Sequence, residues 1–468
     1  MKKRRASFSE EMRTAVEGLP VAELKELVQA VRAGAKEKGL YIEPGQNVEE
    51  PIPMALTPWV FSPEAARYLK GFFRGIRRTV NRVLVRYFDD PRLQAILPLR
   101  ESELKWLKDS CSDGIPKLQT VFERFDTNLS GRLEHPVDDF KIIEFNAVGV
   151  GCVHLIPAAT ELLQEHLLPR LKDWAGGRLV PAADYRNLLL NDLQAHARAL
   201  GRAEGRIGMV ERRESVQGGC DEFARIAAYF ESKGVSAAVG DPREVERQNG
   251  SLLLKGKSVD VLYRDFQLEE VVSIKTHGGS VEGVEAAFTD NQVVSTVFGE
   301  FDHKSLCELL SNPDFQDYFS PLEIKAARRH IPWTRLVEER KTPDPDGKET
   351  DLIPYIRANK DRLVLKPNRS YGGEGVVVGE AVPASAWDEA LNQAAAHPKS
   401  WVVQDQVKIA RASLTVLTAQ GKLDAGERYV TLGVTATAKG VAFVGRYSEG
   451  PVVNISQGGG LIPVFLAG

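Results

Sequence analysis

The chain has 468 residues, of which 43% are hydrophobic and 27% charged, and its formal net charge is −3. This balance is typical of a globular protein of two or three domains, and it provides no global positive field that would favour nucleic acid. No run of about 18 apolar residues is present, and the basic residues 1–6 are not followed by an apolar core. We therefore expect neither a membrane-spanning helix nor a signal peptide.

Four cysteines are scattered along the sequence without CxxC spacing: Cys111, Cys152, Cys220 and Cys307. Their spacing argues against a metal site or a disulfide framework built on cysteine. We therefore expect a cytoplasmic protein, in a compartment where ATP is also available.

Helices are predicted for most of residues 1–105. Apolar residues recur at helical spacing over residues 21–37, and Ser62 followed by Pro63 predicts the start of a second helix. One face of this second helix is apolar, and the other carries Arg74, Arg77, Arg78, Arg82 and Arg86. Such a basic face is most often solvated, and binding of a partner or RNA is the rarer alternative.

Two short strands with alternating polarity are predicted over residues 121–126 and 141–146, around a turn at residues 128–131. If they pair, four polar side chains converge on one sheet surface: Arg124, Asp126, Glu144 and Asn146. This surface suits a divalent cation and phosphate, because Mg²⁺ takes oxygen ligands from one or two carboxylates and completes its shell with substrate phosphates. A solvated edge face is the alternative.

Strands and helices alternate over residues 205–275. An amphipathic helix is predicted over residues 221–233, and strands are predicted at residues 206–210, 234–239, 251–254 and 259–263. This order favours a small α/β subdomain with a parallel sheet. No GxGxxG motif opens its helix, so we assign no dinucleotide site to it.

A helix is predicted over residues 302–310, with Lys304 near its start. A cation at that end is unfavourable relative to the helix dipole. The position favours a functional role for Lys304, although a lysine that faces solvent is the commoner case. A polar loop follows at residues 342–348.

A glycine-rich hairpin is predicted around Lys366. An apolar strand over residues 363–365 ends at this lysine, Pro367 blocks further pairing, and residues 376–378 return as a second strand. The connection between the strands contains Tyr371, Gly372, Gly373 and Gly375. Glycines adopt positive φ readily, so backbone N–H groups and the lysine ammonium could together contact a polyphosphate. A strand follows the glycines, which excludes the common nucleotide loops that precede helices and leaves an ordinary hairpin as the alternative.

Strands are also predicted near the C-terminus. Residues 401–407 predict a buried strand interrupted by polar residues, and residues 441–446 an apolar strand that ends at Arg446. Residues 458–460 predict a flexible glycine loop. An arginine at a strand end usually belongs to the surface, but beside a phosphate site its planar fork could hold a carboxylate or an acyl phosphate.

Five of these segments resemble, in their order, the circularly permuted branch of the ATP-grasp superfamily, which includes eukaryotic-type glutathione synthetase and glutathionylspermidine synthetase. The matching residues are Arg124 and Asp126 of an R-x-D strand, Glu144 and Asn146 of an E-x-N strand, Lys304, Lys366 with Gly372 to Gly375, and Arg446. The resemblance spans residues 60–468. It is closest to the glutathionylspermidine synthase-like proteins, over residues 331–335 and 453–460.

The resemblance implies an ATP-grasp fold of mixed α+β and α/β class, permuted because the E-x-N strand precedes the glycine-rich loop. It implies four segments: a helical N-terminal region at 1–105, a first part of the ATP-grasp domain at 106–200, an inserted Rossmann-like α/β subdomain at 201–300, and the second part of the ATP-grasp domain at 301–468. It leaves a homodimer open.

The activity implied is ATP-dependent ligation of a small-molecule or peptide carboxylate to an amine, with ATP and Mg²⁺. Lys304 and Lys366 would neutralise phosphates, and the loop with Tyr371, Gly372, Gly373 and Gly375 would close over them. Adenine would be read by a hinge that includes Gln404, Asp405 and Val407. Asp126, Glu144 and Asn146 would hold Mg²⁺. Arg124 would stabilise an acyl phosphate, beside Arg446 as a clamp for a carboxylate.

Two departures from the family pattern keep other functions open. Residues 147–151 lack the serines that hold γ-glutamylcysteine in glutathione synthetase, and Ser370 stands where that family places a metal-binding carboxylate. An ATP-binding scaffold or sensor without ligase activity is therefore the main alternative. A phosphotransferase that stops at a phosphorylated product is the third.

Overall fold

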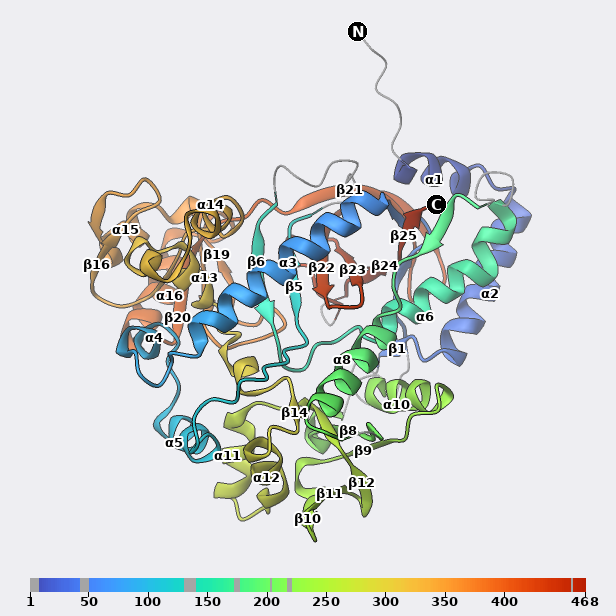
Figure 1. The fold of residues 1–468 in the computed structure, drawn as a ribbon. Coiled ribbons are helices and arrows are strands. Elements are labelled where there is room, and N and C mark those ends of the chain that lie inside the picture. The colour runs from blue at the N-terminus through green and yellow to red at the C-terminus, as the bar shows by residue number, and fades with distance from the viewer. Residues whose placement is uncertain are drawn as a thin grey trace.

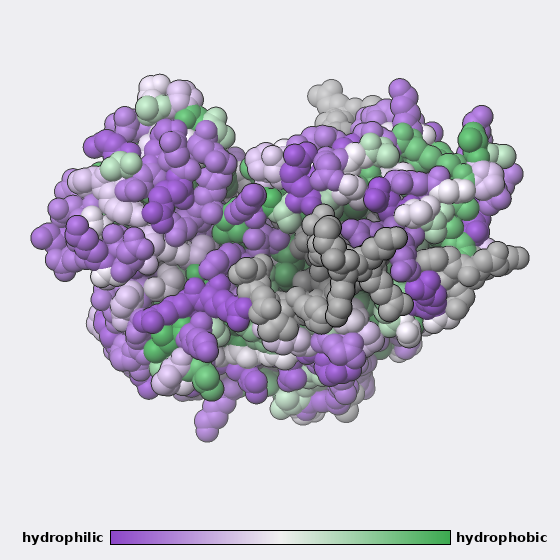
Figure 2. Space-filling view, turned by 90° about the horizontal axis from the view of Figure 1, so that it is seen from above, coloured by the Kyte–Doolittle hydropathy of each residue, from purple (hydrophilic) through white to green (hydrophobic). Residues whose placement is uncertain are grey.

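The computed structural model describes residues 8–42, 50–129, 140–171, 177–202, 204–216, 221–455 and 458–468. The predicted turn at residues 128–131 falls in part outside these ranges, and Cys220 lies outside them. Figure 1 shows helices packed around several separate sheets, with the N-terminal and C-terminal parts of the chain close together. Hydrophilic side chains cover most of the face shown in Figure 2.

The largest sheet joins segments from both ends of the chain. Its order is β21-β3-β24-β23-β22-β5-β6, and β21 also pairs with β22. The strands are β3 (Met54–Ala55), β5 (Arg124–Thr127), β6 (Ile142–Asn146), β21 (Ala410–Leu417), β22 (Leu423–Ala436), β23 (Val441–Ser448) and β24 (Gly460–Ile462). The predicted strands around residues 124 and 144 thus pair with each other, and β5 pairs with β22 from the C-terminal part.

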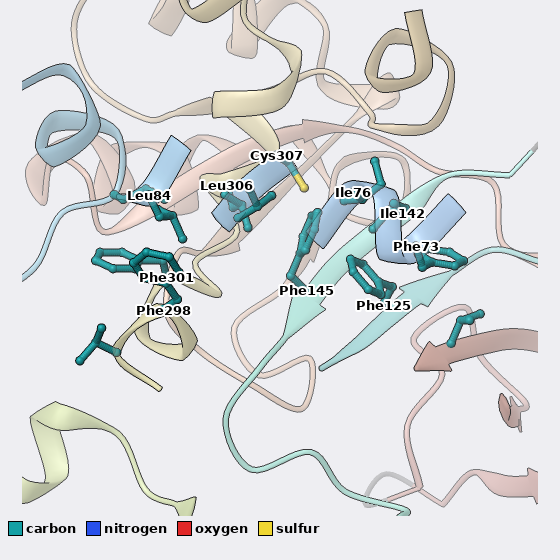
Figure 3. Close-up of a cluster of buried hydrophobic side chains, with 14 of the residues drawn as sticks. Phe73, Ile76, Leu84, Phe125, Ile142, Phe145, Phe298, Phe301, Leu306 and Cys307 are labelled. Carbon is teal, nitrogen blue, oxygen red and sulfur yellow. The ribbon is translucent and has the colours of Figure 1, made fainter. Parts of the chain in front are cut away.

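Helix α3 (Pro63–Leu84) lies across this sheet (Figure 1) and begins as predicted, because Ser62 Oγ accepts a hydrogen bond from the amide of Ala65 at 3.1 Å. Its apolar face packs on β5 and β6, where the ring centroids of Phe73 and Phe125 are 4.7 Å apart (Figure 3). Two arginines of its basic face are engaged in ion pairs, Arg77 with Glu123 and Arg82 with Glu323. The solvated-face interpretation therefore does not hold for Arg77, which is mostly buried, whereas the Arg82 side chain is 54% exposed.

The N-terminal region is mostly helical, as predicted, with α1 (Phe8–Glu17), α2 (Val21–Glu37), α4 (Pro91–Ile96) and α5 (Glu101–Ser110) besides α3. It also contributes short strands. β1 (Tyr41–Ile42) pairs with β2 (Glu50–Pro51), and β4 (Trp59–Phe61) lies beside β25 (Val464–Ala467), which in turn pairs with β7 (Leu179–Pro181). Helices α6 (Leu155–Leu162) and α8 (Tyr185–Ala199) follow the sheet strands β5 and β6 in the chain.

The parallel sheet predicted within residues 205–275 is confirmed. It has the order β14-β13-β8-β9 and all of its pairings are parallel. The strands are β8 (Ile207–Glu211), β9 (Ala237–Gly240), β13 (Val261–Asp265) and β14 (Val293–Val294), and the helices are α9 (Arg213–Val216), α10 (Glu222–Ser232), α11 (Leu268–Thr276) and α12 (Glu282–Thr289). The strand predicted at residues 251–254 belongs instead to an antiparallel sheet of β10 (Val245–Gln248), β11 (Ser251–Leu254) and β12 (Lys257–Val259).

The glycine-rich hairpin belongs to a four-stranded sheet with the order β15-β20-β18-β19. The strands are β15 (Thr334–Leu336), β18 (Leu363–Pro367), β19 (Val377–Val378) and β20 (Trp401–Asp405), and helices α13 (Leu306–Ser311), α14 (Pro321–His330), α15 (Leu352–Ala358) and α16 (Ala384–Ala396) accompany them. The antiparallel pairing of β18 with β19 confirms the predicted hairpin. The polar loop at residues 342–348 is the turn between β16 (Lys341–Pro343) and β17 (Glu349–Asp351).

The helix predicted over residues 302–310 was placed too early. Helix α13 begins at Leu306, and Lys304 lies in the turn before it. Asn368, just after β18, fixes this turn: its backbone oxygen accepts from the Lys304 amide at 3.0 Å, and its side-chain oxygen accepts from the Ser305 amide at 2.9 Å. The turn before the helix is thus tied to the glycine-rich hairpin. None of the helices in the described ranges has the length and apolar run that crossing a membrane requires.

Candidate functional site

One cavity of about 870 Å³ lies between the seven-stranded sheet, the four-stranded sheet and the parallel subdomain. All of the predicted site residues except Gly375 and Asp405 line it. The lining residues among them are Arg124, Asp126, Glu144, Asn146, Lys304, Lys366, Tyr371, Gly372, Gly373, Gln404, Val407 and Arg446. Side chains from distant parts of the chain therefore share a single cavity.

The pairing of β5 with β6 places four of these residues opposite one another in two cross-strand pairs. Arg124 lies opposite Asn146, and Asp126 lies opposite Glu144. On its other side β5 pairs with β22, where Gly433 lies opposite Asp126. A Cβ atom at residue 433 would lie 2.5 Å from Arg124 Cδ. The absence of a side chain at Gly433 therefore provides the room in which Arg124 lies.

Asp126 is the centre of a buried cluster of arginines. Its Oδ1 atom is 2.7 Å from Arg124 Nε, and its Oδ2 atom is 2.8 Å from an amino nitrogen of Arg446. Asn146 Nδ2 also donates to Oδ2, at 3.2 Å. Burial by itself would raise the pKa of Asp126, but Arg124 and Arg446 outweigh burial and hold the pKa well below its usual range. The cluster keeps two guanidinium groups and one carboxylate charged inside the protein.

Glu144 and Asn146 are the oxygen donors best placed for a divalent cation. Glu144 is partly exposed to the cavity, and its Oε2 atom is 3.8 Å from Lys304 Nζ. The Asn146 amide nitrogen is engaged with Asp126 and with the Arg124 carbonyl, which leaves its oxygen for a ligand. In the described ranges no three His, Cys, Asp or Glu side chains gather as a metal site. One carboxylate and one amide oxygen nonetheless fit Mg²⁺, which takes its remaining ligands from water and phosphate.

The two lysines approach the cavity from the other side. Lys304 Nζ donates to the backbone oxygen of Ser370. Lys366 Nζ donates to Gln404 Oε1 at 2.7 Å. Burial lowers the pKa of Lys366 to about 8, with Glu144 opposing the shift and Lys304 adding to it. Both side chains line the cavity, and Lys366 is mainly in its ammonium form at neutral pH.

The glycine-rich hairpin covers part of the cavity. Gly372, Gly373 and Gly375 have φ values of 70°, 77° and 71°, which confirms the backbone expected of them. Asn454 Nδ2 donates to the Gly372 oxygen at 2.7 Å, and Tyr371 Oη donates to Asp302 Oδ1 at 3.2 Å. The loop is therefore held from the C-terminal part of the chain and from the segment before α13.

The two predicted residues outside the lining have other surroundings. Gly375 lies against Pro367, whose Cγ atom would be 2.8 Å from a Cβ at position 375. The side chain of Asp405 lies 3.7 Å from Arg362, and its backbone amide donates to the Trp333 oxygen at 2.8 Å. Val407 lines the cavity beyond it. Of the three residues expected in an adenine hinge, Gln404 and Val407 thus line the cavity.

Sequence reasoning missed the acidic part of the lining. Glu222, Asp265 and Glu270 line the cavity where the parallel subdomain meets it. Asp265 ends β13 beside Glu211, which ends the parallel strand β8. Ligands of open α/β sheets bind outside the carboxyl ends of the strands, between neighbours whose connections run in opposite directions. Applied to the predicted subdomain, this rule would have indicated that the carboxyl ends of its strands belong to the site.

Comparison with known proteins gives a fold but no sequence family. No protein-family model and no curated protein matches the chain. The fold resembles that of a glutathione synthetase-like effector from Globodera pallida, solved in its apo form. The TM-score is 0.59 at 11% sequence identity, and the alignment covers 96% of this chain and 98% of the effector. At this identity the likeness shows a shared mixed α/β fold and nothing about activity.

Proposed function

We propose that the chain is an ATP-dependent carboxylate–amine ligase with a circularly permuted ATP-grasp fold. The observation that carries the proposal is the shared cavity, where Lys304 and Lys366 lie on one side and Glu144, Asn146 and the arginine cluster on the other. A polyphosphate needs cations and backbone amides, and its Mg²⁺ needs oxygen donors. The overall likeness to a glutathione synthetase-like protein supports the same reading.

The four sequence segments take corresponding roles in this proposal. Residues 106–200 and 301–468 supply most of the two sheets of the nucleotide site, and residues 201–300 supply a substrate subdomain. Residues 1–105 add strand β3 to the larger sheet and the helices that pack around it. Lys304 and Lys366 would contact phosphates, with the loop at Tyr371, Gly372 and Gly373 above them. The residues from Gln404 to Val407, at the end of β20 and just after it, would lie along the adenine base.

Glu144 and Asn146 would hold Mg²⁺, whose positive charge would offset that of the phosphates. Asp126 was predicted as a third Mg²⁺ ligand, but its hydrogen bonds fit this role less well than those of Glu144 and Asn146. Both of its oxygens already accept hydrogen bonds from guanidinium groups. We propose that Asp126 instead orients Arg124 and Arg446 toward the substrate carboxylate.

The chemistry would require positioning and charge stabilisation more than covalent work by the protein. The substrate carboxylate would attack the γ-phosphorus of ATP, giving an acyl phosphate and ADP. The substrate amine would then attack the acyl carbon, giving an amide and inorganic phosphate. Arg124 and Arg446 would stabilise the negative charge of the acyl phosphate. Coverage by the glycine-rich hairpin would keep water from hydrolysing it.

ADP release tests the proposal. The protein is incubated with Mg²⁺–ATP and pools of amino acids, polyamines and small peptides, and products are searched for an amide by mass spectrometry. An amide formed together with ADP is the expected result. Lys366→Ala and Glu144→Ala should abolish turnover with the fold intact, and Asn146→Ala should weaken the dependence on Mg²⁺. Turnover at the wild-type rate in the first two variants would contradict their assigned roles.

A nucleotide-binding scaffold is the second candidate, and Ser370 favours it. This residue stands where the family places a metal-binding carboxylate, and its carbonyl oxygen binds Lys304. ATP binding without ADP release in any pool would favour the scaffold. ADP release with a phosphorylated product and no amide would identify a phosphotransferase.

A further inference from the structure

A chain of three buried hydrogen bonds runs across the four-stranded sheet and ends at Lys366. Lys366 Nζ donates to Gln404 Oε1 at 2.7 Å, Gln404 Nε2 donates to Thr334 Oγ1 at 3.0 Å, and Thr334 Oγ1 donates to the Pro332 oxygen at 3.0 Å. Thr334 and Gln404 are only 0% and 1% exposed. Thr334 lies directly opposite Gln404 in the pairing of β15 with β20.

The direction of this chain is imposed from both ends, because the Lys366 ammonium can only donate and the Pro332 carbonyl can only accept. A backbone carbonyl can only accept, so the Thr334 hydroxyl gives its proton to Pro332. The hydroxyl oxygen is then left as an acceptor, and it takes a proton of the Gln404 amide nitrogen. The amide oxygen of Gln404 must consequently face Lys366. The opposite orientation would place an N–H group against the ammonium and leave buried donors unpaired, which is costly.

We propose that Gln404 and Thr334 are positioning residues, which hold the Lys366 ammonium at the cavity wall for the phosphates of the nucleotide. The inference deepens the proposed function and rests on it. It assigns the Gln404 side chain to the phosphate part of the site, whereas the family resemblance gives this residue a role in the adenine hinge, mainly through backbone groups. Both polar ends of its amide are engaged within the protein.

Other charged groups near Lys366 cannot replace this acceptor. Glu144 acts on Lys366 only through its charge, and its carboxylate lies 3.8 Å from the Lys304 ammonium. Lys304 is a cation and repels Lys366. Cys307 is a buried thiol whose pKa burial raises to about 12, so it carries no charge at neutral pH. The oriented amide of Gln404 is therefore the fixed neutral acceptor that decides where the ammonium stands.

The test compares Thr334→Val, which keeps the shape and removes the hydroxyl, with Thr334→Ser, which keeps the hydroxyl. Isothermal titration calorimetry gives the affinities of each full-length variant for ATP, ADP and adenosine. We expect Thr334→Val to bind ATP and ADP about tenfold more weakly, because the Gln404 amide that holds the Lys366 ammonium is no longer fixed; this effect has the size of one charge-assisted hydrogen bond. Adenosine affinity should stay unchanged, and Thr334→Ser should stay near the wild type. Equal ATP affinity in the valine variant, or an equal loss for adenosine, would overturn the inference.

A second measurement needs no nucleotide. Trace acetylation with acetic anhydride, read by mass spectrometry, reports the reactivity of the Lys366 amine. Thr334→Val should raise it several-fold relative to other lysines, because the acceptor that favours the ammonium form is no longer fixed, and Thr334→Ser should not. Gln404→Met gives the same comparison should the valine variant fail to fold. Unchanged reactivity in the folded variant overturns the positioning role. Changed reactivity in a protein that binds no ATP contradicts the proposed function alone.

Discussion

The Arg446 guanidinium lies 2.8 Å from Asp126 Oδ2, although strand β22 separates their own strands in the sheet. Arg124 lies 2.7 Å from the other oxygen of the same carboxylate. One buried anion thus compensates two buried cations, and the positive charge in excess faces the cavity. Four predictions concern this cluster and other features of the structure.

Asp126→Asn should destabilise the fold by about 3–5 kcal/mol, because it leaves two buried guanidinium groups without their counter-charge. Urea unfolding followed by circular dichroism measures the change. Asp109→Asn is a matched control, since Asp109 forms an exposed pair with Lys105 at 2.7 Å. Its effect should stay below about 1 kcal/mol. Equal effects of the two substitutions would contradict the role of Asp126 in the cluster.

Lys366→Met should weaken ATP binding by about 10- to 100-fold, the range for a lost hydrogen bond to a charged group. Because burial lowers the pKa of Lys366 to about 8, wild-type affinity should also fall as the pH rises through this value. The variant has no amine there, so that step should be absent from its pH profile. Lys422→Met, at an exposed position, is the control. A step that persists in Lys366→Met would assign it to another group.

Glu211→Gln should stabilise the protein at pH 8 and have no such effect at pH 4.5. Burial, reinforced by Asp265 and Asp221, raises the pKa of Glu211 from 4.5 to about 7. Between these values the folded state holds more protons than the unfolded state, so stability falls as the pH rises, and above pH 7 the full penalty is present. We expect a gain of about 1 kcal/mol, reduced by solvent screening of the partly exposed side chain. Thermal melts across pH 4.5–8 measure the gain, with the exposed Glu339→Gln as control.

Gly433→Ala and Gly75→Ala should change the free energy of unfolding in opposite directions. A Cβ at position 433 would meet Arg124 Cδ at 2.5 Å and Asp126 Oδ1 at 3.0 Å, so we expect a loss of about 1–3 kcal/mol from overpacking. Gly75 lies within α3 with no atom within 4 Å of its Cβ position. Alanine there should stabilise the helix by about 0.5–1 kcal/mol. A neutral Gly433→Ala would show that Arg124 can move without cost.

Much of the cavity wall could be predicted from local sequence patterns. Alternating polarity placed Asp126 and Glu144 on one face, and the pairing of their strands put them opposite each other. Three glycines after Lys366 predicted the positive φ values of the hairpin. Both inferences needed only the geometry of a strand or a turn, which is set by residues close together in the chain.

Contacts between distant segments could not be predicted in this way. The local pattern at Lys304 and Ser305 does not indicate that Asn368, far along the chain, holds their amides in the turn before α13. The chain through Thr334 depends on β15 lying beside β20, and nothing in the local pattern at Thr334 indicates which strand is its neighbour. The bidentate contact of Arg369 with the buried Glu103, at 2.7 and 2.8 Å, is of the same kind.

The pairing of β5 with β22 has a consequence for biosynthesis. Asp126 leaves the ribosome long before its neighbour Gly433, and the buried arginine cluster cannot be completed until Arg446 has also emerged. Until then the nascent chain carries Arg124 and Asp126 on a strand with one side unpaired. Closing so long a loop is slow, and unpaired strand edges invite aggregation in the meantime. Chaperone dependence during translation should therefore concentrate in the period between the synthesis of these two strands.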